Sequence, residues 1–150
     1  MSERAKRYAA FSAAAIVAFV VIVEGLDVFA RVRIGDQSLS EASSETLHYS
    51  LVEPVGTLFS FLPFAAIAWI CASLARVSRS RAIGIMIACL ALFALMYYGG
   101  YMDSQKYMLQ RMWTAATLAV GLIPFKSIPI VLVAFGLRFV LARNHASSPA

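Results

Sequence analysis

Residues 82–101, AIGIMIACLALFALMYYGGY, form an apolar stretch without a single charged side chain. A helix of about 20 mostly apolar residues can cross the hydrocarbon core of a bilayer, so this stretch predicts a transmembrane helix. Three further stretches meet the same criterion, at residues 8–29, 54–74 and 113–141. The chain is 61% hydrophobic, against about 45–50% in soluble domains. We therefore expect an all-α integral membrane protein with four transmembrane helices.

The positive charges alternate between high and low from one connecting segment to the next. Eight of the 13 Lys and Arg residues lie at the two chain ends and between the second and third stretches, namely Arg4, Lys6, Arg7, Arg76, Arg79, Arg81, Arg138 and Arg143. The other two connections carry four, and Lys126 lies inside the last stretch. Because basic segments are retained in the cytoplasm, both termini are expected to be cytoplasmic. The pI near 9.6 then reflects membrane topology, and no nucleic-acid partner is expected.

The connection after the first stretch, about residues 31–53, is the largest segment expected outside the membrane. Its sequence Ser38-Leu-Ser-Glu41 has the spacing of a capping box, which begins a helix. We expect a short external helix from there to about His48, lying at the membrane interface. Residues 1–142 then form a single four-helix transmembrane domain, and residues 143–150 are expected to be a disordered cytoplasmic tail.

The last apolar stretch is too long for a straight crossing. Residues 113–141 would extend over about 40 Å as a helix, whereas the hydrocarbon core is about 30 Å thick. The stretch contains Pro124 and Pro129, and each proline removes one backbone donor from a helix. We therefore expect a proline-bent fourth helix, and a similar kink at Pro63 in the second.

Lys126 lies between these two prolines, about 18 Å along the helix from Arg138 and close to the middle of the bilayer. A charge at that depth costs about 2.5–3.5 kcal/mol. One hypothesis is that Lys126 belongs to an ion, proton or anionic-ligand site at a broken helix. The other is that Lys126 pairs with Glu24 or Asp27, or extends along a tilted helix to a lipid headgroup.

Glu24 and Asp27 lie three residues apart near the external end of the first stretch, so they share a helix face. Together with Lys126 they form a candidate buried-charge site, in which the carboxylates would admit a cation or proton. The alternative is that both carboxylates are solvated at the interface and pair with basic neighbours. Arg31, four residues after Asp27, is placed to form such a pair.

A second candidate site is an external polar cluster of His48, Glu53, Tyr98, Tyr101 and Asp103. Histidine, tyrosine and aspartate side chains are able to bind a quinone headgroup or a metal. Tyrosines at this depth are also what the aromatic belt of a membrane protein predicts. A single histidine is too few for a haem with two axial imidazoles. We expect no cofactor and no metal from the sequence.

The chain carries none of the common catalytic or nucleotide-binding motifs, so no catalytic residue is assigned. We expect a small accessory, assembly or structural subunit of a membrane complex, with lipids and other membrane subunits or further copies of itself as partners. From its compactness and short loops, we expect the chain to lie in a bacterial inner membrane. One alternative is a small oligomeric transporter or channel that uses Lys126 with Glu24 and Asp27. Another is a membrane redox or lipid-modifying enzyme at the external cluster.

Overall fold

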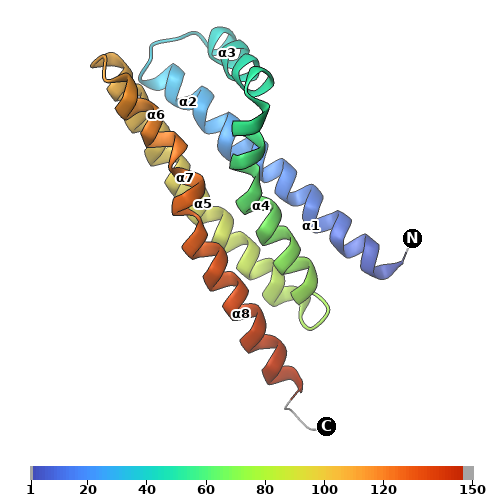
Figure 1. Ribbon diagram of the computed structural model, residues 1–150. Helices are drawn as coiled ribbons and strands as arrows, with labels where there is room; N and C mark the ends of the chain where they lie inside the picture. Colours follow the sequence, from blue (N-terminus) through green and yellow to red (C-terminus); the bar gives the residue numbers. More distant parts are fainter. Residues whose placement is uncertain (1, 147–150) are drawn as a thin grey trace.

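The computed structural model describes residues 2–146, which contain helices and no β-strand (Figure 1). In chain order the elements are α1 (Glu3–Phe19), the π-helical turn η1 (Val20–Glu24), α2 (Gly25–Arg33), α3 (Leu39–Val52), α4 (Pro54–Leu74), α5 (Arg79–Leu109), α6 (Trp113–Gly121), α7 (Ile123–Lys126) and α8 (Ile128–Ala146).

These helices make four rods that are long and apolar enough to cross a membrane. The first rod combines α1, η1 and α2; the second is α4, the third is α5, and the fourth combines α6, α7 and α8. By length and composition, this confirms the prediction of an all-α multi-pass membrane protein. The bounds of α4 match the predicted stretch 54–74.

Helix α5 continues eight residues beyond Tyr101, where the apolar stretch had been expected to end. The added turns are polar but well supported, because Lys106 Nζ pairs with Asp103 Oδ1 at 3.2 Å, three residues apart. Ser104 and Gln105 are each only 7% exposed. Hydropathy alone underestimates this helix, since two polar residues of its last turns, Ser104 and Gln105, are buried against other helices.

The first rod contains a π-helical turn that we did not expect from the sequence. The Gly25 N–H donates to the Val20 carbonyl, five residues back, so one extra residue is accommodated before α2. Such turns occur as local features inside α-helices and are frequent at functional sites. Here the turn ends at Glu24, and Asp27 follows in the first turn of α2.

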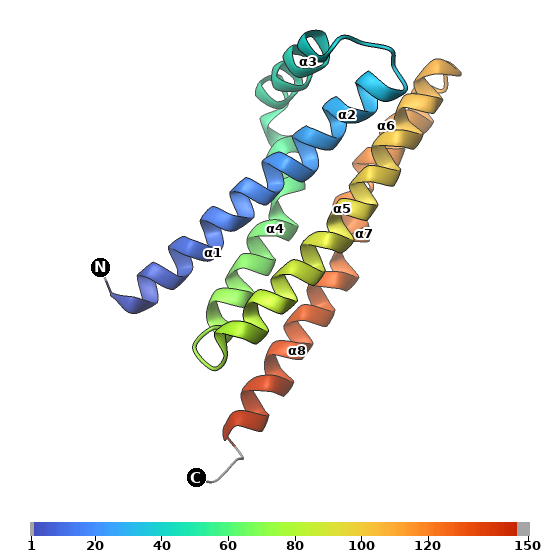
Figure 2. The ribbon, with the colours of Figure 1, turned by 180° about the vertical axis from the view of Figure 1, so that it is seen from behind.

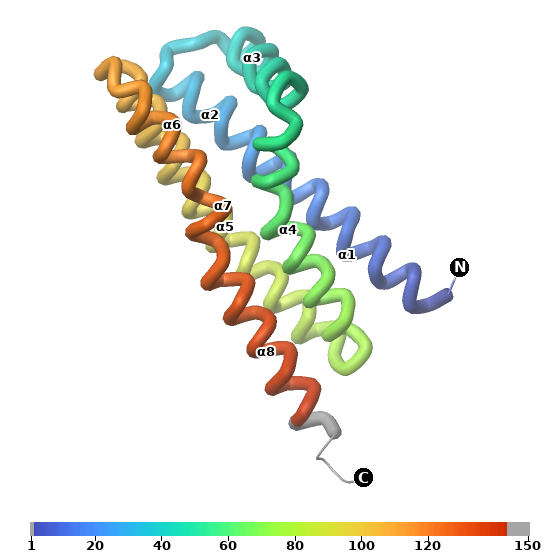
Figure 3. Tube along the Cα trace, in the orientation of Figure 1, coloured from blue at the N-terminus to red at the C-terminus, as the bar shows by residue number. Residues whose placement is uncertain are grey.

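Helix α4 lies at the centre of the arrangement and packs against α1, α5 and α8 (Figure 3). Helix α5 forms an antiparallel hairpin with α6, and α2 packs against α5 and α3. Seen from behind, α1 diverges from α5 and α8 toward its own beginning (Figure 2). The start of α1 and the end of α8 lie toward one end of the molecule, while α3 lies at the other (Figure 1).

Aromatic side chains fill the core around α4. The Phe64 ring contacts the rings of Phe19, Phe93 and Tyr97, with centroid distances of 5.5, 5.0 and 6.2 Å. Phe64, Phe93 and Tyr97 are almost fully buried. Rings of this size bury large apolar areas, and edge-to-face contacts such as that of Phe19 with Phe64 add to the stabilisation.

In the fourth rod the helix is interrupted at Leu122 and Ser127, each two residues before a proline. Pro124 and Pro129 lack the N–H groups that would continue the hydrogen-bond ladder, which explains the interruptions. The Ser127 hydroxyl donates to the Pro124 carbonyl oxygen. Helix α8 runs to Ala146, so residues 143–146 of the expected tail are helical, and residues 147–150 lie outside the described residues.

Helix α3 begins with the expected capping box. The Glu41 N–H donates to Ser38 Oγ at 3.3 Å, and the Ser38 N–H donates to Glu41 Oε2 at 3.0 Å. The helix continues to Val52, four residues beyond His48. Glu53 separates it from Pro54 at the start of α4, where proline is well tolerated.

The capping box makes the start of α3 sensitive to acid. Hydrogen bonds from the Ser38 hydroxyl and backbone N–H lower the pKa of Glu41. The stabilisation is therefore present above the unfolded-state pKa, about 4.3, and is lost as the pH falls through the lower folded-state pKa. We expect amide hydrogen exchange in the first turn of α3, corrected for intrinsic rates, to accelerate over that acidic range. An unchanged acid profile in Glu41→Gln would contradict this origin.

Candidate functional site

Two adjoining cavities lie among α2, α3, α4, α5 and α6, with volumes of about 210 and 370 Å³. We call them together the polar groove, because they share six lining residues: Asp27, Glu53, Gly56, Ser60, Tyr101 and Val120. The smaller part adds Glu24, and the larger part adds Arg31, Ser104 and Gln105. The groove therefore lies at the end of the molecule that carries α3.

Hydrogen bonds from α3 hold both carboxylates of the first rod. Ser50 Oγ donates to the two carboxylate oxygens of Glu24, at 2.8 and 2.9 Å, and Thr46 Oγ1 donates to Asp27 Oδ2 at 2.8 Å. These bonds partly replace the water that the carboxylates lose on burial. They also fix α3 against the first rod.

Arg31 links the same two elements through ion pairs. Its Nε donates to Asp27 Oδ2 at 2.9 Å, which confirms the pair expected from their spacing, and its Nη1 donates to Glu45 Oε2 at 2.6 Å. The guanidinium also lies over the Tyr49 ring, 5.4 Å from its centroid. The side chains of Arg31 and Asp27 are only 12% and 13% exposed, so this pair is largely shielded from water.

Three side chains on α5 face the groove without a hydrogen-bond partner of their own in the described part of the chain. They are Tyr101, Ser104 and Gln105. Together with Met108 they follow the spacing of one helix face, three or four residues apart. The neighbouring face of α5 carries Asp103 and Tyr107, which line a different cavity.

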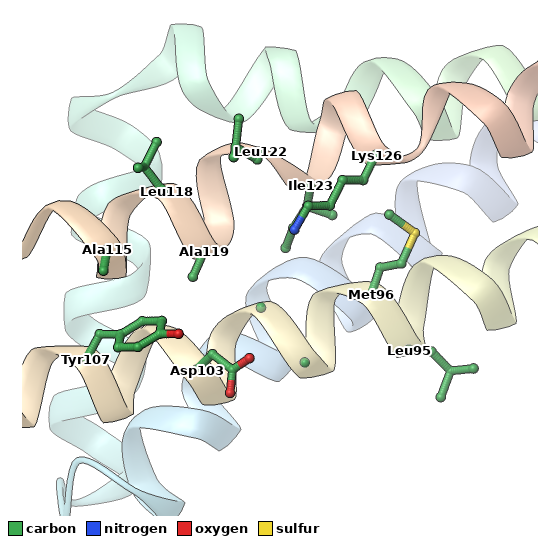
Figure 4. Close-up of a pocket in the computed structure, with 12 residues that line it drawn as sticks. Leu95, Met96, Asp103, Tyr107, Ala115, Leu118, Ala119, Leu122, Ile123 and Lys126 are labelled. Carbon is green, nitrogen blue, oxygen red and sulfur yellow. The ribbon is translucent and has the colours of Figure 1, made fainter. Parts of the chain in front are cut away.

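Lys126 lies in that second cavity, which we call the lysine pocket. It has a volume of about 570 Å³ between α5 and the α6–α7 rod and is lined by Leu95, Met96, Gly99, Gly100, Asp103, Tyr107, Ala115, Leu118, Ala119, Leu122, Ile123 and Lys126. In Figure 4 the Lys126 side chain extends from α7 toward the space over α5. Within residues 2–146, no carboxylate lies within 4.0 Å of its ammonium group.

Lys126 therefore lines a different cavity from Glu24 and Asp27, the residues with which the sequence grouped it. Those carboxylates are held by Ser50, Thr46 and Arg31 instead.

The residues of the expected external cluster are distributed over several places. Glu53 and Tyr101 line the polar groove, whereas Asp103 lines the lysine pocket and bonds to Lys106. Tyr98 is 47% exposed and its ring lies near Phe29, with centroids 6.4 Å apart. The His48 ring lies near Tyr49. Among the described residues, no three His, Cys, Asp or Glu side chains are grouped in a way that could hold a metal ion.

Several residues of the groove were not identified from the sequence, above all Thr46, Ser50, Ser104 and Gln105, and neither was Glu45, which pairs with Arg31. A helical projection of α3 would place Thr46 and Ser50 on one face, four residues apart. No pattern along the chain indicates that this face meets Glu24 and Asp27. Ser104 and Gln105 had been assigned to an external loop because the apolar stretch ends before them.

Comparison with protein-family models, curated proteins and solved structures gives no match.

Proposed function

We propose that this chain is a small accessory or assembly subunit of a membrane complex. The observation that carries the proposal is the Lys126 ammonium, which has no carboxylate within 4.0 Å in the described chain and lies about midway along an apolar rod. Asp103, on the wall of the same pocket, pairs with Lys106. An isolated charge near the middle of a bilayer costs about 2.5–3.5 kcal/mol, and such residues usually face a partner and pair with it. A carboxylate on a helix of the partner would supply the missing charge.

The surface around Lys126 suits the approach of another helix. Gly99, Ala115 and Ala119 line the lysine pocket beside it, and a Cβ added at Gly99 would meet no atom within 4 Å. Small residues at a membrane-embedded surface allow two backbones to come close enough for extensive van der Waals contact. The partner is either another membrane subunit or a second copy of this chain.

Helix α1 offers further support. It buries Phe11, Ala15 and Phe19, whereas Ala9, Ala13 and Ala14 are exposed. Within the chain α1 packs mainly on α4, so much of its surface is available to lipid or to other helices.

We further propose a topology with both termini in the cytoplasm of a bacterial cell and the four rods in its inner membrane. The eight basic residues at the chain ends and in the α4–α5 connection support this orientation. In this topology α3 lies outside, at the membrane interface, and the fourth rod bends at Pro124 and Pro129. The transporter alternative has less support, since Lys126 does not line the same cavity as Glu24 and Asp27.

The proposal is tested by substituting Lys126 and identifying the chains that co-purify in mild detergent. We expect Lys126→Leu to lower the yield of the partner at least tenfold, because the loss of a membrane-buried ion pair exceeds 1.4 kcal/mol. Lys126→Arg keeps the charge and is expected to retain the partner. Lys106→Leu is the matched control, since Lys106 is exposed and has its own counter-ion in Asp103.

Cysteine crosslinking from Gly99 should then map the contact to a partner helix that carries an aspartate or glutamate within its apolar span. Equal recovery of the same chains with Lys126→Leu would contradict the proposal.

A further inference from the structure

We propose that the polar groove binds a small organic cation, an ammonium group attached to an apolar body. This inference goes beyond the accessory-subunit function and does not depend on it. The larger part of the groove has a volume of about 370 Å³, within the range of about 300–1,000 Å³ found for small-molecule sites. It is lined from α2, α4, α5, α6 and α7, so a ligand would contact all four rods.

The first observation is that buried polar side chains on its wall lack partners. Ser104 and Gln105 are each 7% exposed, and within residues 2–146 neither side chain has a hydrogen bond. Their polar atoms keep access to the groove and are not sealed in the core, so their hydrogen-bonding capacity is available there to water or to a ligand. Both side chains line the groove and can donate and accept hydrogen bonds there.

The second observation is the sign of the charge. Glu24, Asp27 and Glu53 line the groove, and Arg31 is the one basic residue among its lining side chains. The Arg31 guanidinium is already engaged by Asp27 and by Glu45. The Glu53 carboxylate has no ion pair in the part of the chain that the structure describes. An excess of carboxylates in a partly dry cavity attracts a cation.

The third observation distinguishes an organic cation from a metal ion. The described acidic residues do not converge into a group of three that could coordinate a metal. The remaining wall is largely apolar, with Phe59, Met108, Val120 and Pro124. An ammonium group near Glu53 and the Tyr101 ring would gain ion-pair and cation–π attraction, while its apolar body would lie along these side chains. A metal ion would make no contact with these apolar side chains that stabilises its binding.

The test uses the full chain in lipid nanodiscs and isothermal titration calorimetry with 2-phenylethylammonium chloride. A matched neutral probe, 2-phenylethanol, has the same apolar body and a hydroxyl in place of the ammonium. We expect saturable binding of the ammonium probe with one site per chain and at least tenfold weaker binding of the alcohol. Empty nanodiscs measure partition into lipid, which is subtracted.

Two variants locate the site. Glu53→Gln removes the unpaired carboxylate and Gln105→Leu removes the buried amide, and each is expected to weaken binding of the ammonium probe at least fivefold. The controls are Glu3→Gln and Gln110→Leu, which make the same changes at exposed positions outside the groove. If Gln105→Leu fails to fold, Glu53→Gln still decides, because Glu53 is exposed.

Absence of saturable binding, equal affinity for the ammonium and the alcohol, or unchanged affinity in Glu53→Gln would each overturn the proposal. In those cases the groove is a water-filled polar cavity. Because this readout contains no second protein, its failure leaves the Lys126 experiment unaffected.

Discussion

Replacing Arg31 with methionine is expected to lower the free energy of unfolding by about 3 kcal/mol, because it leaves the Asp27 carboxylate largely buried without its counter-ion. Methionine keeps much of the apolar stem of arginine, so the decrease in unfolding free energy comes mainly from removal of the guanidinium charge. The substitution also removes the Glu45 pair and the contact with the Tyr49 ring, so α3 loses attachments to the first rod. Unfolding in detergent by a denaturant titration measures the effect.

The matched control is Lys106→Met, which breaks the exposed pair with Asp103, where both side chains are more than half exposed. Exposed pairs contribute about 0–1 kcal/mol, so this control should change stability little. If both variants lost a similar amount of unfolding free energy, burial of the Arg31–Asp27 pair would not be the cause of the loss in Arg31→Met. The double variant Arg31→Met with Asp27→Asn should recover part of the stability, since it removes the unpaired charge.

The second large effect is expected at Gly100, where α5 approaches the fourth rod. A Cβ added there would lie 3.0 Å from the Ala119 carbonyl oxygen and would clash with the side chain of Ile123. Ile123 is 2% exposed and therefore has little room to move away. Because α5 and α6 would have to separate, Gly100→Ala is expected to destabilise the protein by about 1–3 kcal/mol, despite the better helix propensity of alanine.

The adjacent residue provides the control for this prediction. A Cβ at Gly99 would meet nothing within 4 Å, so Gly99→Ala is expected to be neutral or slightly stabilising. The two variants differ by one position in the same helix, and thermal unfolding in the same detergent compares them directly. Equal stabilities would mean that α5 and α6 do not pack as closely as the structure has them.

The part of α5 beyond its apolar stretch contributes polar side chains to both cavities. Over residues 99–108 one face carries Tyr101, Ser104 and Gln105 to the polar groove, and another carries Asp103 to the lysine pocket. A helix that ended at Tyr101 would not carry Asp103, Ser104 or Gln105 to these cavities.

Many residues of the candidate site were singled out from the sequence one by one, but their grouping in space was not predicted. Glu24 and Asp27 were noticed because two carboxylates three residues apart share one helix face at the end of an apolar stretch, and Arg31 because it lies four residues from Asp27. Glu53 and Tyr101 were noticed as members of a broader external cluster. The grouping of Lys126 with Glu24 and Asp27 relied on the tendency of opposite charges in a membrane to pair, and that tendency does not specify which faces of two helices meet.

The amino-acid sequence by itself determined the number of apolar rods, the start of α3 and the Asp27–Arg31 pair, because each depends on residues within a few turns of one another. Only the tertiary structure decided that Ser50 and Thr46 hold the carboxylates of the first rod and that Gln105 is buried beside them. It also decided that Lys126 lies in a separate pocket. Hydropathy and helical spacing are properties of one segment, whereas a cavity is formed by the faces that several segments present to one another.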